Sequence, residues 1–97
     1  LRRSESWRGM RIILTDHARF EARRRHIPEE VVRDIAANPE QKLVASRGRL
    51  MHQGRYHDPV EAQEMLLRVI GVMEGDAFRV ITIYKTSKIE KYWAKEG

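Results

Sequence analysis

Two long apolar runs, at residues 66–73 and 77–85, dominate the pattern of hydrophobic and polar positions along the chain. Both runs are rich in β-branched and aromatic residues, and a short turn around Gly75 and Asp76 separates them, which is typical of an antiparallel hairpin. Nearly every position on both faces of this hairpin is apolar. We therefore expect the hairpin to form the centre of a sheet in which much of both faces is covered.

Helical spacing of apolar residues precedes the hairpin. Thr15 or Asp16 can supply the N-cap of a first helix that runs to about Arg25. Pro28 begins a second helix, which ends before Pro39 because the residue before a proline disfavours helical geometry. We expect the apolar stripe of this second helix to pack on one face of the sheet.

The remaining elements are shorter. Residues 42–45 and 49–57 read as strands joined by a turn at residues 46–48, and a loop separates them from the hairpin. Residues 11–14 fit either an edge strand or a segment packed against the core. The tail at residues 88–97 fits a turn of helix or an edge strand.

These elements predict a single α+β domain over residues 10–97, with two N-terminal helices packed on a four-stranded antiparallel sheet. Residues 1–9 show no periodicity and are expected to form a flexible arm, with Met10 as a natural start.

Composition narrows the classes of function. No apolar run among the 97 residues approaches the roughly 20 residues of a membrane span, and no signal peptide is recognisable, so we expect a cytoplasmic protein. The absence of cysteine excludes disulfides, thiolate metal sites and cysteine nucleophiles. The chain has 19 Lys and Arg against 14 Asp and Glu, and its net charge of +5 favours a polyanionic partner such as nucleic acid.

A polar strip is expected on the first helix. At about 100° per residue, His17, Glu21, Arg24 and Arg25 fall between two apolar flanks, which would turn His17 and at least one arginine towards the body of the protein. The alternative is that Glu21 forms only a surface ion pair with an arginine three or four residues further on.

Three polar residues stand out in the apolar hairpin: Arg68, Thr82 and Tyr84. Together with residues of the first helix they form a set that suits phosphodiester cleavage without a metal ion. Histidine exchanges a proton near neutral pH, arginine and lysine stabilise charge on a pentacoordinate phosphate, and tyrosine donates a hydrogen bond. The candidate catalytic residues are His17, Arg25, Arg68, Thr82 and Tyr84, and the candidate RNA-binding residues are Arg24, Lys85 and Lys88.

The register of the hairpin decides whether Arg68 and Tyr84 meet. A two-residue loop pairs Glu74 with Ala77 and places Arg68 on the face away from Tyr84. A three-residue loop, or one β-bulge, instead pairs Arg68 with Tyr84. The turn residues favour the two-residue loop, whereas the functional hypothesis requires the other register.

Each candidate also has a structural explanation. Arg68 could pair with a carboxylate such as Glu64, Thr82 is an ordinary strand residue, and Tyr84 could simply close the core. We expect His52 and His57 to be solvated. The histidines and acidic residues lack a metal-ligand spacing, so no metal site is expected.

Five short segments carry a resemblance to a known family: LTDHA at 14–18, RHIP at 25–28, NPE at 38–40, LRVI at 67–70 and VITIYK at 80–85. Over roughly residues 12–88 the chain resembles a widespread small bacterial family known only as a domain of unknown function. That family is similar to the RelE/ParE-like toxins of toxin–antitoxin loci and lies near the barnase–EndoU–colicin–RelE group of metal-independent RNases.

The resemblance implies a helical N-terminus, a four-stranded antiparallel sheet and a cleft between them that takes RNA. It places the functional positions of the family on His17, Arg25, Arg68, Thr82 and Tyr84. The chain departs from the family pattern in the residue after Arg25, where His26 replaces a small residue and leaves the end of the first helix less defined.

Three hypotheses follow. The first is a toxin-like, metal-independent RNA endonuclease or a domain derived from one, with RNA, free or on the ribosome, as substrate and an antitoxin as partner. The second is a non-catalytic module of the same fold that binds nucleic acid or protein. The third is an interaction protein, such as a homodimer, whose basic residues form only a solvated surface. None of the three hypotheses involves a cofactor or a membrane.

Overall fold

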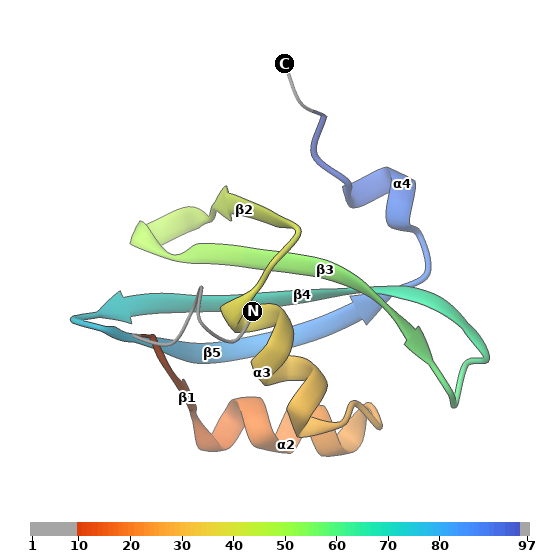
Figure 1. Cartoon of the computed structure of the whole chain (residues 1–97), viewed down its shortest axis with the longest axis horizontal. Coiled ribbons are helices and arrows are strands. Elements are labelled where there is room, and N and C mark those ends of the chain that lie inside the picture. The colour runs from red at the N-terminus through yellow and green to blue at the C-terminus, as the bar shows by residue number, and fades with distance from the viewer. Residues whose placement is uncertain (1–9, 96–97) are drawn as a thin grey trace, which may run out of the picture.

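A five-stranded sheet forms the centre of the computed structural model, which describes residues 10–95 (Figure 1). In chain order the elements are β1 (Arg11–Leu14), α2 (Asp16–Arg24), α3 (Glu29–Ala37), β2 (Gln41–Val44), the 3₁₀ turn η1 (Ser46–Gly48), β3 (Leu50–Asp58), β4 (Gln63–Glu74), β5 (Ala77–Thr86) and α4 (Ile89–Tyr92). The strand order is β1-β5-β4-β3-β2. The arm predicted at residues 1–9 lies outside the described residues.

The prediction of an α+β fold is confirmed, but the prediction of four antiparallel strands is wrong. β1 joins the sheet as a fifth strand, parallel to β5, with Arg11 opposite Ala77 and Leu14 opposite Val80. The backbone amide of Arg11 donates to the carbonyl of Asp76 (2.9 Å), which fixes the start of this pairing. Parallel partners lie far apart in sequence, so no local pattern identifies them.

The centre of the sheet is the predicted β4–β5 hairpin, with the predicted two-residue turn. Glu74 pairs with Ala77 across Gly75 and Asp76. A β-bulge then shifts the register: Ile70 pairs with Thr82, but Gly71 pairs with Val80. Beyond the bulge Arg68 lies opposite Tyr84. The two-residue turn and the pairing of Arg68 with Tyr84 therefore occur together, although the turn alone would place Arg68 on the other face. The bulge shifts the register by one residue and brings the two side chains onto one face.

Gly71 makes this bulge sterically feasible. A Cβ atom at this position would lie 2.4 Å from the backbone oxygen of Arg79 and 2.9 Å from Cζ of Phe78. We expect Gly71→Ala to lower the free energy of unfolding by about 1 to 3 kcal/mol, because the clash is with backbone that cannot move aside. Urea unfolding followed by circular dichroism measures this loss.

Gly54→Ala is the matched control, because the three atoms nearest to a Cβ at Gly54 all belong to the side chain of Ile35, the nearest at 3.4 Å. The smaller clash should cost less stability than Gly71→Ala. An equal or larger loss in Gly54→Ala would contradict this account of the bulge.

The two N-terminal helices lie close to their predicted bounds. Thr15 is the N-cap of α2, and its hydroxyl accepts a hydrogen bond from the amide of Ala18 (3.1 Å). Pro28 is the N-cap of α3, which ends at Ala37. Between the helices, His26 adopts a positive φ of 59°, a conformation that ends α2 and is uncommon for a side-chain-bearing residue.

The hydrophobic core lies between these helices and one face of the sheet. As predicted, α3 packs on β3 and β4, while α2 packs along β5, below it in Figure 1. The core cluster consists of Leu14, Ala18, Ala22, Ile27, Val32, Ile35, Ala36, Leu67, Val69, Phe78, Val80 and Ile83.

His52 is buried against this core, so the expectation that it is solvated is wrong, whereas His57 is exposed. The His52 ring stacks on Phe78 at 4.2 Å between centroids, and Nδ1 of His52 lies 2.7 Å from the carbonyl oxygen of Ala36. Burial lowers the pKa of His52 against the opposing effect of the hydrogen bond to Ala36. Because a carbonyl oxygen only accepts, Nδ1 carries the hydrogen in this bond.

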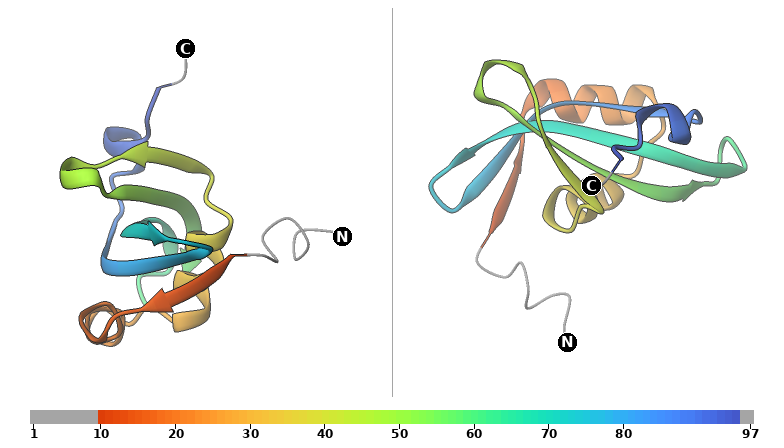
Figure 2. Two further views of the ribbon diagram at one scale, coloured as in Figure 1. Left: turned by 90° about the vertical axis from the view of Figure 1, so that its left-hand side faces the viewer. Right: turned by 90° about the horizontal axis from the view of Figure 1, so that it is seen from above.

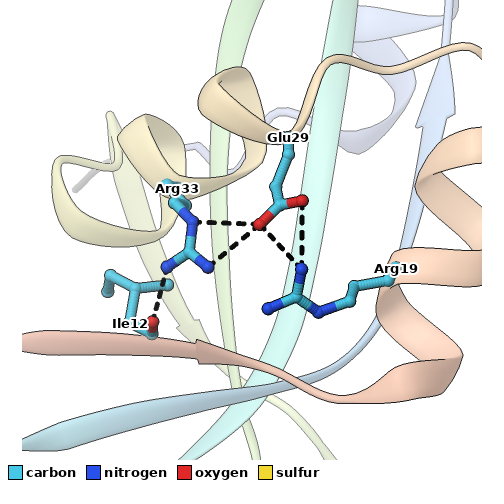
Figure 3. A network of polar contacts seen from close by, with 4 residues as sticks. All are labelled: Ile12, Arg19, Glu29 and Arg33. Atoms are coloured by element: carbon cyan, nitrogen blue, oxygen red, sulfur yellow. Dashed lines mark hydrogen bonds and ion pairs between the residues drawn. The ribbon is translucent and has the colours of Figure 1, made fainter.

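The carboxylate of Glu29 is the centre of a polar network between β1, α2 and α3 (Figure 3). Glu29, at the start of α3, accepts hydrogen bonds from Arg19 of α2 (3.1 and 3.2 Å) and from Arg33 one turn further on (3.0 and 3.2 Å). Arg33 also donates to the carbonyl of Ile12 in β1 (2.7 Å). This network connects β1, α2 and α3, and it helps to hold β1 at the edge of the sheet.

The C-terminal segment, residues 89–94, covers part of the other sheet face, which we call the open face. Figure 2 shows α3 and α4 on opposite sides of β3 and β4. The Gln41 side chain donates to the carbonyl of Ala94 (2.8 Å) and accepts from its amide (3.0 Å). On the hairpin this segment places Tyr92 against Arg68, while Arg68, Ile70 and Tyr84 stay half-buried. The expectation that much of both faces of the hairpin is covered therefore holds for the face under the helices and only in part for the open face. Within residues 10–95, no helix is long and apolar enough to cross a bilayer.

Candidate functional site

Arg68 and Tyr84 form the centre of the candidate site, on the open face. They face each other across β4 and β5, and Nη1 of Arg68 donates a hydrogen bond to the Tyr84 hydroxyl. Nε of Arg68 donates to Oε1 of Gln53, its neighbour on β3 (2.8 Å). The β-bulge is the structural cause of this arrangement, since without it the two side chains would point to opposite faces.

The guanidinium of Arg68 is half-buried among neutral groups. It lies 4.7 Å from the ring centroid of Tyr92 and 5.5 Å from that of Tyr84. Among residues 10–95 no carboxylate lies within ion-pair distance of it, so the expected alternative of a pair with Glu64 is wrong. Burial of a cation without a counter-charge is costly, which makes Arg68 suited to receive an anion.

A chain of amides holds the Arg68 site in place. The side chain of Gln53 is fully buried, and its Nε2 donates to Oε1 of Gln41 (2.7 Å) and to the carbonyl of Tyr92 (3.2 Å). Gln53 therefore connects Arg68 to the C-terminal segment. Gln53 and Tyr92 were not among the residues predicted for the site. The signal for Tyr92 was its place next to Trp93 in an otherwise charged tail, because two adjacent aromatic residues indicate that the tail packs against the rest of the fold.

Thr82 lies on the same face as Tyr84, two residues before it and opposite Ile70. No hydrogen bond of its hydroxyl occurs within the described part of the chain, residues 10–95. Thr82 is thus next to the Arg68–Tyr84 pair but makes no polar contact with it.

The polar strip of α2 is partly buried. Glu21 is 8% exposed, and its Oε1 accepts from Nη2 of Arg24 (3.0 Å) and from Nε of Arg25 (2.9 Å). The hydrogen bond from Arg24, together with the one from Arg25, lowers the pKa of the Glu21 carboxyl against the opposing effect of burial. Arg24 and Arg25 are therefore both engaged by one carboxylate.

His17 lies one turn before Glu21 on the same side of α2 and is exposed. Within residues 10–95 its imidazole forms no hydrogen bond, ion pair or ring contact. The structure therefore joins Arg68 with Tyr84 but does not bring His17 into contact with them, although α2 packs along the strand that contains Tyr84.

Lys85, predicted to bind RNA, instead belongs to a buried ion pair. Its side chain is 10% exposed and its ammonium lies 2.7 Å from Oδ2 of the fully buried Asp58. The Tyr56 hydroxyl also donates to this oxygen (2.7 Å), while the amides of Val60 and Glu61 donate to Oδ1 (2.9 and 3.0 Å). Burial and pairing leave Lys85 unable to reach a ligand at the surface.

The electrostatics of this cluster follow from its contacts. Burial alone would raise the pKa of Asp58, but the hydrogen bonds from Lys85, the Glu61 amide and Tyr56 outweigh it and hold the pKa well below its usual range. Burial raises the pKa of Tyr56, and its bond to the Asp58 carboxylate acts in the same direction. In the sequence, Asp58 only follows the predicted strand at residues 49–57, at the start of the loop before the hairpin.

Lys88, the other predicted RNA-binding residue, is exposed just before α4. It lies close in the chain to Lys91 and Lys95, which are also exposed.

Within residues 10–95, no cluster of three or more His, Cys, Asp or Glu side chains could hold a metal ion.

The fold and the site together define an α+β domain with a mixed five-stranded sheet and a half-buried, unneutralised arginine on its open face. No match to the chain was found among protein-family models, curated proteins or solved structures.

Proposed function

We propose that this chain is a small, toxin-like RNA-cleaving domain that binds a phosphate of single-stranded RNA at Arg68 and acts without a metal ion. The observation that carries the proposal is the state of Arg68, a half-buried guanidinium held by the neutral groups of Gln53 and Tyr84 and free of any carboxylate in residues 10–95. Such a group gains most from an anionic ligand, because its own charge is otherwise uncompensated.

The surroundings of Arg68 favour a nucleic acid over a small anion. The rings of Tyr84 and Tyr92 lie against the guanidinium, and aromatic side chains stack on unpaired bases. The net charge of the chain is +5, which attracts a polyanion. A strand of RNA offers both the phosphate and the bases.

In the proposed cleavage, the 2′-hydroxyl of the RNA attacks the adjacent phosphorus and the bond to the 5′-oxygen of the next nucleotide breaks. The products are a 2′,3′-cyclic phosphate and a 5′-hydroxyl. Arg68 stabilises the charge that develops on the phosphate, and Tyr84 orients it. His17 accepts the proton of the 2′-hydroxyl, and water protonates the departing 5′-oxygen. Because α2 packs on the core face of the sheet and His17 makes no contact with Arg68 or Tyr84, this step requires the RNA strand to pass from the open face around the edge of β5 to α2.

Arg68→Gln tests the binding step. We expect it to weaken the affinity for a fluorescein-labelled single-stranded RNA by roughly 10- to 100-fold, because charge-assisted hydrogen bonds contribute about 1.5 to 3 kcal/mol. Fluorescence anisotropy at low salt, with a chelator present, measures the affinity, and thermal unfolding shows whether the variant is folded.

Arg23→Gln is the matched control, since Arg23 is exposed on α2 and its side chain makes no ion pair within residues 10–95. It removes the same charge away from the site and should change the affinity little. If both variants lose affinity equally, binding reflects overall charge alone and the site at Arg68 is wrong.

One observation favours a second candidate function, a non-catalytic RNA-binding module. His17 makes no contact with Arg68 or Tyr84, so the described residues hold the phosphate site without an adjacent proton-transfer group. Binding that depends on Arg68, with no cleavage products after long incubation, would support this module over the nuclease.

A further inference from the structure

A pocket lies beside the Arg68 site, between β3 and the C-terminal segment. It has a volume of about 270 Å³ and is lined by Arg55, Ile89, Glu90, Trp93 and Lys95. The guanidinium of Arg55 lies 4.7 Å from the centroid of the Trp93 ring. The volume is small compared with the sites of drug-sized ligands and suits a single planar ring system.

The same short segment builds both the pocket and the phosphate site. Tyr92 lies against Arg68, and the next residue, Trp93, lies against Arg55. On β3, Gln53 contacts Arg68, and Arg55 follows two residues later on the same face. Adjacent parts of one extended ligand can therefore occupy the two sites together.

The charges around the pocket favour a nucleotide chain. Arg55 is neutralised by Glu40, whose Oε2 lies 2.7 Å from Nη2 of the arginine. Lys95 lines the pocket, Lys88 and Lys91 are exposed nearby, and Glu90 is the one acidic residue at positions 87–95. The lining itself is close to neutral, because Glu40 and Glu90 balance Arg55 and Lys95, and the positive charge comes from Lys88 and Lys91 beside it. The pocket thus combines a flat aromatic surface with positive charge next to it, as single-strand-binding sites do.

We propose that this pocket binds a nucleobase of the RNA strand whose phosphate lies at Arg68. The base stacks against the Trp93 ring, and the lysines contact the phosphates that follow. This inference rests on the proposed function, since it assumes RNA at Arg68, and it adds a base-binding subsite formed by Arg55, Ile89 and Trp93.

The test uses tryptophan fluorescence in a Trp7→Phe background, in which Trp93 is the one remaining tryptophan. A short single-stranded RNA should quench Trp93, whereas a strand of equal length with abasic nucleotides should not. We expect the RNA to bind about 5- to 100-fold more tightly than the abasic strand, in line with the stacking of one base on an aromatic ring.

Trp93→Leu should reduce this preference by weakening RNA binding without changing the affinity for the abasic strand. The preference that remains would come from stacking on Tyr84 and Tyr92, and an unchanged preference would contradict the base pocket. Trp93→Phe, which retains an aromatic surface, should restore most of it. Phe20→Leu is the matched control, because Phe20 is an exposed aromatic residue on α2, outside the pocket.

The outcomes separate the two proposals. If RNA and the abasic strand bind equally well, and both lose affinity in Arg68→Gln, the base pocket is wrong while the phosphate site stands. If neither strand binds the intact chain, the proposed function fails, and the base pocket fails with it.

Discussion

Replacing Asp58 with asparagine is expected to lower the free energy of unfolding by about 3 to 5 kcal/mol, the usual cost of removing one partner of a buried ion pair. Asp58 is fully buried and accepts from the ammonium of Lys85, the Tyr56 hydroxyl and two backbone amides. An amide in its place leaves the charge of Lys85 buried without compensation.

Urea unfolding followed by circular dichroism measures this loss. Glu61→Gln is the control, because Glu61 lies 3.8 Å from the Lys85 ammonium with a side chain that is 45% exposed. An exposed pair of this kind contributes at most about 1 kcal/mol. A loss in Asp58→Asn no larger than that in Glu61→Gln would show that Asp58 does not hold this end of the sheet.

The same carboxylate gives the fold a defined response to acid. The pKa of Asp58 is lower in the folded chain than in the unfolded chain, where it is about 3.9. The unfolded state therefore binds the proton first, so the contribution of Asp58 is complete above about pH 5 and decreases as the pH falls below that value. The pKa of Glu40 is lowered by its bond to Arg55 and acts in the same direction.

Replacing His17 with alanine is expected to slow cleavage of single-stranded RNA by about 100- to 10,000-fold, the usual contribution of a general acid or base. The affinity for RNA should stay the same, because the phosphate site at Arg68 does not include His17. The side chain is exposed and has no partner in residues 10–95, so its removal should not disturb the fold. Product formation in the presence of EDTA, at saturating protein, measures the rate of the chemical step.

His57→Ala is the control, since His57 is an exposed histidine at the end of β3. It should cleave RNA at the rate of the unchanged chain. A His17→Ala variant that retains the full rate would remove His17 from the mechanism. Arg68-dependent binding would then support the non-catalytic module.

Long-range packing decided which candidate residues form a site. Arg68 and Tyr84 were identified because polar side chains in an apolar hairpin require a polar partner. The structure places the two residues in direct contact. Lys85 was identified from its charge alone, and the fold instead buries it against Asp58. Charge is visible in the sequence, but the partner that neutralises it is not.

The sequence by itself determined the local features of this protein. The apolar runs and the Gly75–Asp76 turn defined the hairpin, while Thr15 and Pro28 marked where the helices begin. Each of these features depends on residues close together in the chain, through capping, turn geometry and side-chain periodicity.

Only the tertiary structure decided how distant segments meet. It added β1 as a parallel fifth strand, placed the bulge at Gly71 and laid the C-terminal segment over Gln53 and Arg68. The site on the open face depends on the bulge at Gly71 and on the position of the C-terminal segment. A one-residue change of register reverses the direction of every side chain beyond it, so the pairing of the whole sheet, rather than any local pattern, determines whether Arg68 and Tyr84 share a face.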